Sequence, residues 1–277
     1  MGLKDKFGII KKLYFQIQLH EITALGAQVT YYLILSFFPF LIFMVTLISY
    51  TKVSSMESVA VLSSILPKSV YALIVDVLQN VFTYRNKSLL PIGIVATLWS
   101  ASTGVLAFMV GINKAYSQKE TRPFWKIRIM SILFTLGFSM IILISILLVV
   151  FGTMMREYLF NVLGFPHNFK YLWDVMRYVI SLITMMTIFI LLYFYTPNCM
   201  LRLKNVIPGA ILSTIVWIIL SIGFAFYVNN FANFSYTYGS IGAIIALLIW
   251  LYWSSVIVLV GNELNAMLSK DSIKTCK

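Results

Sequence analysis

Long stretches without a charged residue dominate the pattern of hydrophobic and polar positions along this chain. Each residue of a helix rises about 1.5 Å, so a membrane core about 30 Å thick needs about 20 mostly apolar residues. The charge-free stretches cover residues 22–51, 88–113, 129–155, 178–201 and 205–262. Each of the first four predicts one span. The fifth is too long for one helix and is broken by the polar and aromatic segment 229–239, so it predicts two spans joined by a short turn.

The pattern therefore predicts an all-α membrane protein with six spanning helices, at about 23–50, 89–112, 129–153, 174–197, 205–230 and 240–267. Together they form a membrane domain over 23–268, followed by a cytoplasmic tail over 269–277. Between the first two spans, Pro67, Lys68 and Asp76 divide the apolar runs into short pieces. Segment 52–88 is therefore expected to form short extracytoplasmic helices.

The first 22 residues have a different pattern. Phe7, Ile10, Tyr14 and Ile17 recur at helical spacing, while the lysines lie elsewhere around the helix. This is typical of an amphipathic helix lying in the headgroup region. The lysines alone also fit a simple orientation signal, and the two interpretations are equally open.

Composition and charge agree with a membrane location. Of the 277 residues, 60% are hydrophobic and 11% are charged, whereas soluble domains carry about 25% charged residues. With the N-terminus inside, 14 Lys and Arg fall in inside segments and 7 in outside segments. Cytoplasmic loops retain such residues, so both termini are expected in the cytoplasm of a multi-pass protein of the cytoplasmic membrane. The expected partners are membrane lipids, with a second copy of the chain or envelope proteins as further candidates.

Few groups are available for catalysis. The nine acidic residues lie mostly at predicted membrane edges or in loops, and His20 and His167 fall on opposite predicted sides of the bilayer. The HExxH, GxSxG and Walker motifs do not occur. Cys199 and Cys276 have no metal-ligand spacing. We therefore expect no enzymatic activity, no metal and no cofactor.

Glu263 is the acidic residue that best fits a functional role. It lies near the predicted cytoplasmic end of the sixth span, and Asn262 and Asn265 flank it. A charge at the centre of a span costs about 2.5–3.5 kcal/mol, so an acidic residue there is a functional candidate by default. It would act as a gate, or as a proton or substrate contact. The alternative is an interfacial residue paired with a loop cation such as Arg122.

Further polar residues in apolar surroundings predict a polar cavity between the first, second and sixth spans. Pro39 should kink the first span because it cannot donate a backbone hydrogen bond; the kink is either a hinge or simple packing. The small residues near Ser100 and Ser102 favour close helix packing, with hydroxyls that bond across the interface. The full candidate set is Gln28, Tyr31, Tyr32, Ser36, Pro39, Ser100, Ser102, Asn113, Asn262, Glu263 and Asn265.

The loop 113–128 interleaves cations with aromatic residues, and within it Glu120 and Arg122 are a candidate cytoplasmic ion pair. In a soluble protein this pattern is typical of single-stranded nucleic acid binding. Here the positive-inside bias explains the cations, and anchoring at the interface explains Phe124 and Trp125. No nucleic acid partner is expected.

Several of these segments together resemble the YihY/BrkB family of bacterial inner-membrane proteins, once labelled ribonuclease BN. The segments that carry the resemblance are Tyr31 to Pro39, Trp99 to Gly104, Asn113 with Ala115, Tyr116, Glu120 and Arg122, Tyr238 to Ala243, Trp250 to Tyr252, and Gly261 to Ala266. The resemblance implies a six-helix protein with both termini inside. It also implies the roles to which members have been linked, namely virulence and envelope or lipid export.

Three functions are compatible with the sequence. The leading hypothesis is a transporter-like protein that moves a small solute or a lipid. The second is a membrane scaffold that organises envelope proteins, with 52–88 as its docking surface. The third, a ribonuclease, is disfavoured because the chain lacks an acid–base or metal constellation.

Overall fold

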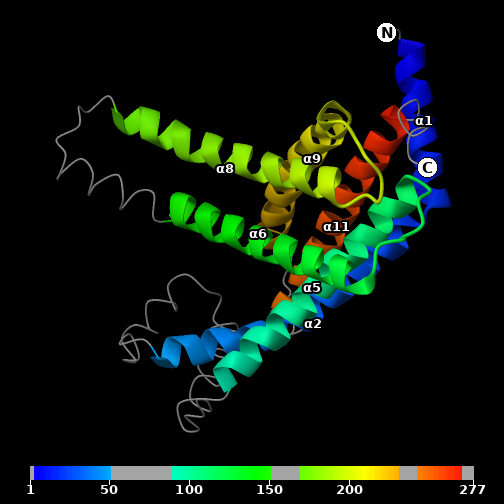
Figure 1. The fold of residues 1–277 in the computed structure, drawn as a ribbon. Helices are drawn as coiled ribbons and strands as arrows, with labels where there is room; N and C mark the ends of the chain where they lie inside the picture. The colour runs from blue at the N-terminus through cyan, green and yellow to red at the C-terminus, as the bar shows by residue number, and fades with distance from the viewer. Residues whose placement is uncertain (1–2, 51–88, 151–168, 231–241, 270–277) are drawn as a thin grey trace. The chain divides into compact units, whose positions relative to one another are not determined.

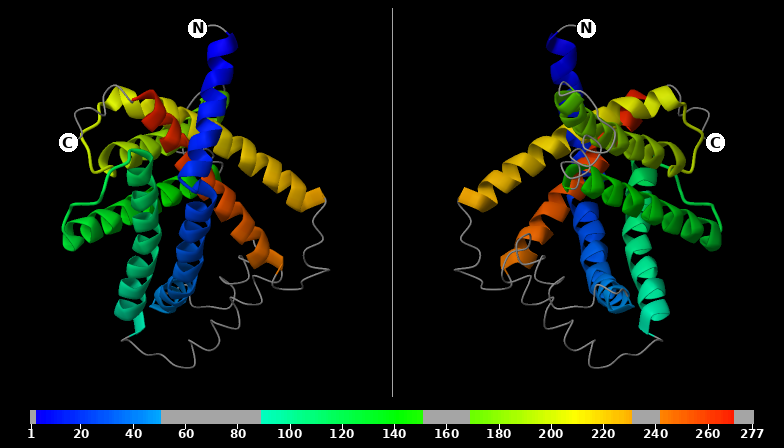
Figure 2. Two further views of the ribbon diagram at one scale, coloured as in Figure 1. Left: turned by 90° about the vertical axis from the view of Figure 1, so that its right-hand side faces the viewer. Right: turned by 90° about the vertical axis from the view of Figure 1, so that its left-hand side faces the viewer.

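The computed structural model describes residues 3–50, 89–150, 169–230 and 242–269. Within these ranges the chain is helical and contains no strand. Figure 1 labels the helices along the chain, and Figure 2 shows them from two further sides. Their bounds are α1 (Leu3–Leu19), α2 (Ile22–Tyr50), α5 (Leu89–Ala115), α6 (Phe124–Val150), α8 (Phe169–Tyr195), α9 (Leu203–Asn230) and α11 (Gly242–Leu268).

Some sequence-based predictions fall outside the described residues. They are the extracytoplasmic helices over 52–88, the tail beyond residue 269, and most of the polar break at 229–239. The side chain of Pro39 also lies outside the described part, although the residue itself belongs to α2.

The described helices include four that are long and apolar enough to cross a membrane. Their apolar windows are Pro91–Ala115, Tyr178–Tyr195, Leu203–Val228 and Ile244–Leu268, with 11–33% of each window buried inside the protein. In α2, the stretch Ile22–Ser36, whose side chains the structure describes, is a shorter apolar helix. Side chains this apolar and this exposed need lipid as their solvent. The chain is therefore a multi-pass membrane protein, and its described residues form helices and connecting loops without a strand.

Two helices begin earlier than the sequence predicted. α6 begins at Phe124 rather than near 129, and α8 begins at Phe169 rather than near 174. The prediction started the span of α6 directly after Arg128, and it started the span of α8 four residues after Lys170. Helices continue past such residues because long basic side chains keep their charged ends at the level of the headgroups. Within the first 22 residues, Leu3–Leu19 form the helix α1, which is followed by a turn in which Glu21 has the left-handed φ of 53°.

The chain divides into two compact units. The first unit comprises residues 1–22, 109–218 and 257–277, and the second comprises 23–108 and 219–256. In the first unit α6 packs along α8, and the two green helices lie side by side in Figure 1.

In the second unit, glycines allow close packing. A Cβ on Gly26 would lie 2.6 Å from Cγ2 of Val256, and one on Gly104 would lie 3.0 Å from Cδ2 of Leu33. α2 therefore packs closely against both α5 and α11 at positions where a glycine, which has no Cβ, lies at the contact.

Candidate functional site

The predicted cavity residues divide between the two units. Asn113, Asn262, Glu263 and Asn265 belong to the first unit, and all four side chains are buried. The other described candidates belong to the second unit: Gln28, Tyr31, Tyr32, Ser36, Ser100 and Ser102. The structure brings the four residues of the first unit together with other polar groups. We call this set the polar cluster: His20, Asn113, Glu120, Arg122, Tyr193, Asn198, Gly209, Ser213, Gly261, Asn262, Glu263 and Asn265.

Glu263 and His20 form a part-buried contact between a carboxylate and an imidazole in the polar cluster. Nδ1 of His20 lies 2.7 Å from Oε1 of Glu263, although the residues are 243 positions apart. The side chain of Glu263 is 1% exposed and that of His20 is 12% exposed. A carboxylate oxygen and a ring nitrogen at this distance form a hydrogen bond. The sequence-based alternative paired Glu263 with Arg122, but in the structure His20 is its partner and Arg122 pairs with Glu120.

The last turns of α11 direct polar residues at three different helices. Asn265 and Gly261, four positions apart, face α9. Asn262 faces α5 and donates from Nδ2 to the carbonyl of Ile112 at 3.3 Å. Glu263 faces the end of α1. Successive helix residues are rotated by about 100°, so three neighbouring positions reach three neighbouring helices. The end of α11 is thus the centre of the polar cluster.

Asn265 completes the hydrogen bonding of the first turns of α9. Its Oδ1 accepts from the backbone N–H of Gly209 at 2.6 Å, and its Nδ2 donates to the carbonyl of Val206 at 3.1 Å. Pro208 lies between these two residues inside the helix. Proline disturbs the local hydrogen-bond ladder, and a side chain from a neighbouring helix can replace what is lost.

Glycines bring α9 and α11 into direct backbone contact. A Cβ built on Gly209 would overlap the carbonyl oxygen of Gly261, and one built on Gly261 would overlap Oγ of Ser213. Gly209 and Ser213 are four positions apart, the spacing of small residues at close helix contacts in membranes. The hydroxyl of Tyr193 on α8 lies 2.7 Å from Oγ of Ser213 and donates to the carbonyl of Val258 at 2.7 Å. Close packing and these hydrogen bonds therefore hold α8, α9 and α11 together.

A second set of polar contacts joins the loop after α5 to the loop after α8. Asn113 donates to Oε2 of Glu120 at 2.9 Å and accepts from the backbone N–H of Asn198 at 2.7 Å. Arg122 donates to both carboxylate oxygens of Glu120, at 2.7 and 2.6 Å, and to the carbonyl of Thr196 at 2.9 Å. These hydrogen bonds from Arg122 lower the pKa of Glu120 below its ordinary value of 4.5, and Asn113 adds to the effect. The fork of Arg122 thereby fixes the geometry of both loops.

The second-unit candidates show a different environment. Gln28 and Tyr31 are exposed, whereas Ser36 and Ser102 are buried. Ser36 donates to the carbonyl of Leu33 at 2.6 Å, and Ser102 donates to that of Trp99 at 2.9 Å. Both hydroxyls therefore bond to carbonyls of their own helices.

Several members of the polar cluster were not among the sequence candidates. Gly209 and Ser213 carried a usable signal, since two small residues four apart in an apolar helix favour close packing. Tyr193 and Asn198 lie in an apolar run and a loop without any pattern that would single them out. The sequence showed His20 only as one of two histidines that fall on opposite predicted sides of the bilayer.

Within the described ranges, no group of three or more His, Cys, Asp or Glu side chains could hold a metal ion. The polar cluster contains two acidic side chains, Glu120 and Glu263, and each already has a cationic or imidazole partner. Its chemistry is therefore that of paired charges and amide hydrogen bonds.

Comparison with known proteins identifies the family. The model of the virulence factor BrkB family matches residues 13–275. The ribonuclease-like protein YfkH of Bacillus subtilis is 40% identical over 261 residues, which cover 94% of this chain and 95% of that protein. A UPF0761 membrane protein of Alteromonas mediterranea is 26% identical over 279 residues, covering 97% of this chain and 89% of the relative.

A second UPF0761 membrane protein, from Pseudoalteromonas translucida, is 33% identical over 111 residues, covering 40% of this chain and 36% of the relative. No solved structure matches the chain. The family match extends over nearly all of the sequence, which confirms the resemblance seen in the sequence motifs. The chain belongs to the BrkB family of membrane proteins.

Proposed function

We propose that this protein is a non-enzymatic, transporter-like protein of the cytoplasmic membrane, which moves a small solute or a lipid and uses the His20–Glu263 pair as a gate. The observation that carries the proposal is the burial of Glu263, whose side chain is 1% exposed and bonded to His20 in the turn after α1. A buried ionisable residue in a membrane protein is costly to keep and marks a substrate, ion or gating site by default.

The position of the pair fits a gate. His20 lies in the turn that follows α1, whose sequence pattern fits a helix at the membrane surface, and Glu263 lies near the end of α11, one of the apolar spans. The pair therefore ties a surface helix to a spanning helix. Competition from a bound solute would break the hydrogen bond that joins the turn after α1 to α11.

Hydrogen bonds also support the proposed topology of six spans with both termini in the cytoplasm. They connect the ends of α1, α5, α8 and α11 with the beginnings of α6 and α9. These are the helix ends that such a topology places on one side of the membrane. The same side carries the larger share of Lys and Arg.

Reconstitution tests the proposal. Purified protein in liposomes is assayed in two arms, one following a fluorescent phosphatidylglycerol across the bilayer and one following the release of entrapped small solutes. The wild type is expected to move material in at least one arm, and Glu263→Gln is expected to change the rate while remaining folded. Glu21→Gln is the matched control, because Glu21 pairs with Lys114 at 3.0 Å but is 72% exposed.

The same assay separates transport from the scaffold hypothesis. A scaffold gives liposomes that move neither lipid nor solute above the protein-free level, while deletion of 52–88 abolishes the recovery of envelope partners and leaves membrane insertion intact. A ribonuclease would instead degrade RNA after stringent purification. The proposal requires flux and no enzymatic activity. Liposomes without flux would therefore contradict it, and so would degradation of RNA by the purified protein.

A further inference from the structure

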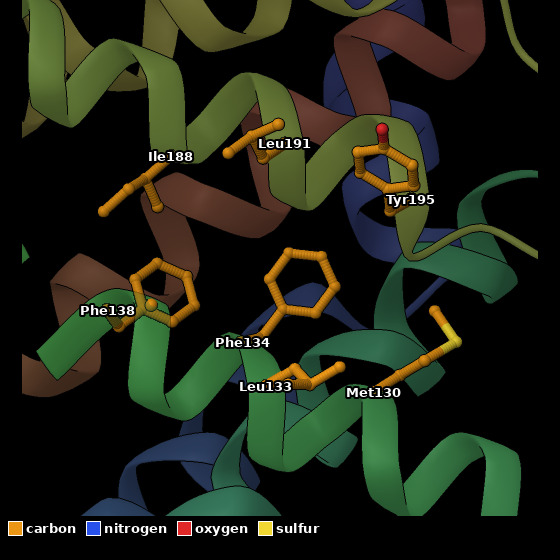
Figure 3. A pocket seen from close by; sticks show the side chains of 8 residues that line it. Met130, Leu133, Phe134, Phe138, Ile188, Leu191 and Tyr195 are labelled. Atoms are coloured by element: carbon orange, nitrogen blue, oxygen red, sulfur yellow. The ribbon is translucent and has the colours of Figure 1, made fainter. Parts of the chain in front are cut away.

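An apolar groove runs between α6 and α8 in the first unit. Its volume is about 420 Å³, and its lining includes Met130, Phe134 and Phe138 from α6 and Ile188, Leu191 and Tyr195 from α8. Figure 3 shows Met130 and Tyr195 at one end of the groove and Phe138 and Ile188 at the other. The groove contains none of the residues of the polar cluster, so it is a separate feature of the molecule.

The end of the groove marked by Met130 and Tyr195 is the end where α6 begins. Lys126 precedes Met130 by one helical turn, so it lies on the same face of α6 as the groove residues 130, 134 and 138. Its side chain is exposed, and in the described part of the chain it forms no ion pair or hydrogen bond. Arg122, whose guanidinium lies 3.6 Å from the sulfur of Met130, is already bonded to Glu120. Lys126 is thus an unneutralised cation at the mouth of an apolar groove.

The length of the groove fits one leaflet of a bilayer. Met130 and Phe138 are eight residues apart, which corresponds to about 12 Å along a helix, and Lys126 lies about 6 Å further toward the start of α6. The hydrocarbon half of a bilayer is about 15 Å deep. A ligand lying along α6 would therefore have its apolar part at the depth of the acyl chains and its polar end at the depth of the headgroups.

We propose that this groove is a binding site for one acyl chain of an anionic phospholipid, whose phosphate pairs with Lys126. The groove lies between helices of a membrane protein, where acyl chains are the surrounding medium, and its volume falls in the ~300–1,000 Å³ range of small-molecule sites. Charge complementarity selects the anionic class of lipid. A second copy of the chain is the poorer occupant, because each copy carries a net charge of +12 and would bring like charge toward Lys126.

Gly137 allows the groove to be filled without disturbing the fold. It lines the groove, and a Cβ built on it meets no atom within 4 Å. Leucine at this position would place its side chain in the space proposed for the acyl chain. Gly223 on α9 is the matched control, because a Cβ there also meets nothing within 4 Å and the residue lies outside the groove. Lys204 on α9 is exposed and serves as the matched control for the charge of Lys126.

The test is native mass spectrometry of the purified full-length protein, titrated with phosphatidylglycerol or with phosphatidylcholine. The wild type should bind one phosphatidylglycerol more tightly than phosphatidylcholine. Lys126→Gln should weaken the affinity for phosphatidylglycerol about fivefold, because one basic residue at a membrane surface contributes roughly 1 kcal/mol. The affinity for phosphatidylcholine should not change. Gly137→Leu should weaken the binding of both lipids. Gly223→Leu and Lys204→Gln should behave as wild type.

Three results would overturn the proposal. One is lipid binding that Gly137→Leu leaves unchanged, which would mean that lipids attach only around the outside of the protein. Another is equal loss of phosphatidylglycerol from Lys126→Gln and Lys204→Gln, which would indicate a diffuse charge effect. The third is a dimer peak that disappears in Gly137→Leu, which would make a second copy the occupant. None of these results depends on whether the protein transports anything.

Discussion

Nδ1 of His20 lies 2.7 Å from Oε1 of Glu263, and this contact joins the turn after α1 to the end of α11 across 243 residues of sequence. Removing one member of a buried pair leaves the other charge without compensation, which typically destabilises a protein by about 3–5 kcal/mol. The pair should therefore behave as an energetically coupled unit.

A double-mutant cycle on this pair is expected to show that coupling. His20→Ala, Glu263→Gln and the double variant are compared with wild type by unfolding in mixed detergent–SDS micelles. The interaction energy should lie between about 0.5 and 3 kcal/mol. The cycle with Lys114→Ala and Glu21→Gln should give less than about 1 kcal/mol, because that pair is exposed and screened. Equal coupling in the two cycles would contradict the structural account.

The contact between α9 and α11 predicts strong sensitivity to added methyl groups. Gly209→Ala and Gly261→Ala place a Cβ onto the carbonyl of Gly261 and onto Oγ of Ser213, respectively, so each should destabilise the protein by about 1–3 kcal/mol or more. Gly223→Ala meets no neighbour and should be neutral or stabilising by up to about 1 kcal/mol, since alanine favours helices. The same unfolding measurement checks all three variants, and a tolerated Gly209→Ala would show that the helices are further apart.

The two asparagines of α11 should respond differently to truncation. Asn265→Ala leaves the N–H of Gly209 without its 2.6 Å partner and removes a second bond to Val206, so a loss of about 1–3 kcal/mol per unsatisfied group is expected. Asn262→Ala removes one 3.3 Å bond and an Oδ1 that is buried without a hydrogen-bond partner among the described residues. The loss of stability should therefore be smaller for Asn262→Ala than for Asn265→Ala. A larger loss from Asn262→Ala would reverse the assigned roles.

The Glu120 carboxyl should make the stability of the two loops depend on pH. Its pKa is lowered below 4.5 by hydrogen bonds from Arg122. A carboxyl whose pKa is lower in the folded state stabilises the protein above its unfolded-state pKa, and this stability is lost as the pH falls through the folded-state value. The stability difference between wild type and Glu120→Gln should therefore be present near neutral pH and shrink below about pH 4.5. In an Arg122→Gln background the difference should be smaller at neutral pH, and a pH-independent difference would contradict the assignment.

The lengths of the stretches without charged residues predict much of the fold, but they do not predict much of the polar cluster. The stretches between charges locate every described helix from α2 onward, because lipid excludes unpaired charge and unpaired backbone. The first turns of α6 were missed because Lys126 and Arg128 belong to the helix although they carry charge. Glu263 and Asn265 could be singled out as polar residues in an apolar helix. Their partners His20 and Gly209 are distant in sequence, and only packing brings them together.

The measurement that tests the central claim most directly is the ratio of flux between wild type and Glu263→Gln in the liposome assay, at equal amounts of folded protein. If the buried pair gates a transport path, the ratio should differ from one by about tenfold or more, corresponding to roughly 1.4 kcal/mol, while Glu21→Gln stays at the wild-type rate. Wild-type flux that Glu263→Gln leaves unchanged, or no flux from wild type in either arm, would contradict the account.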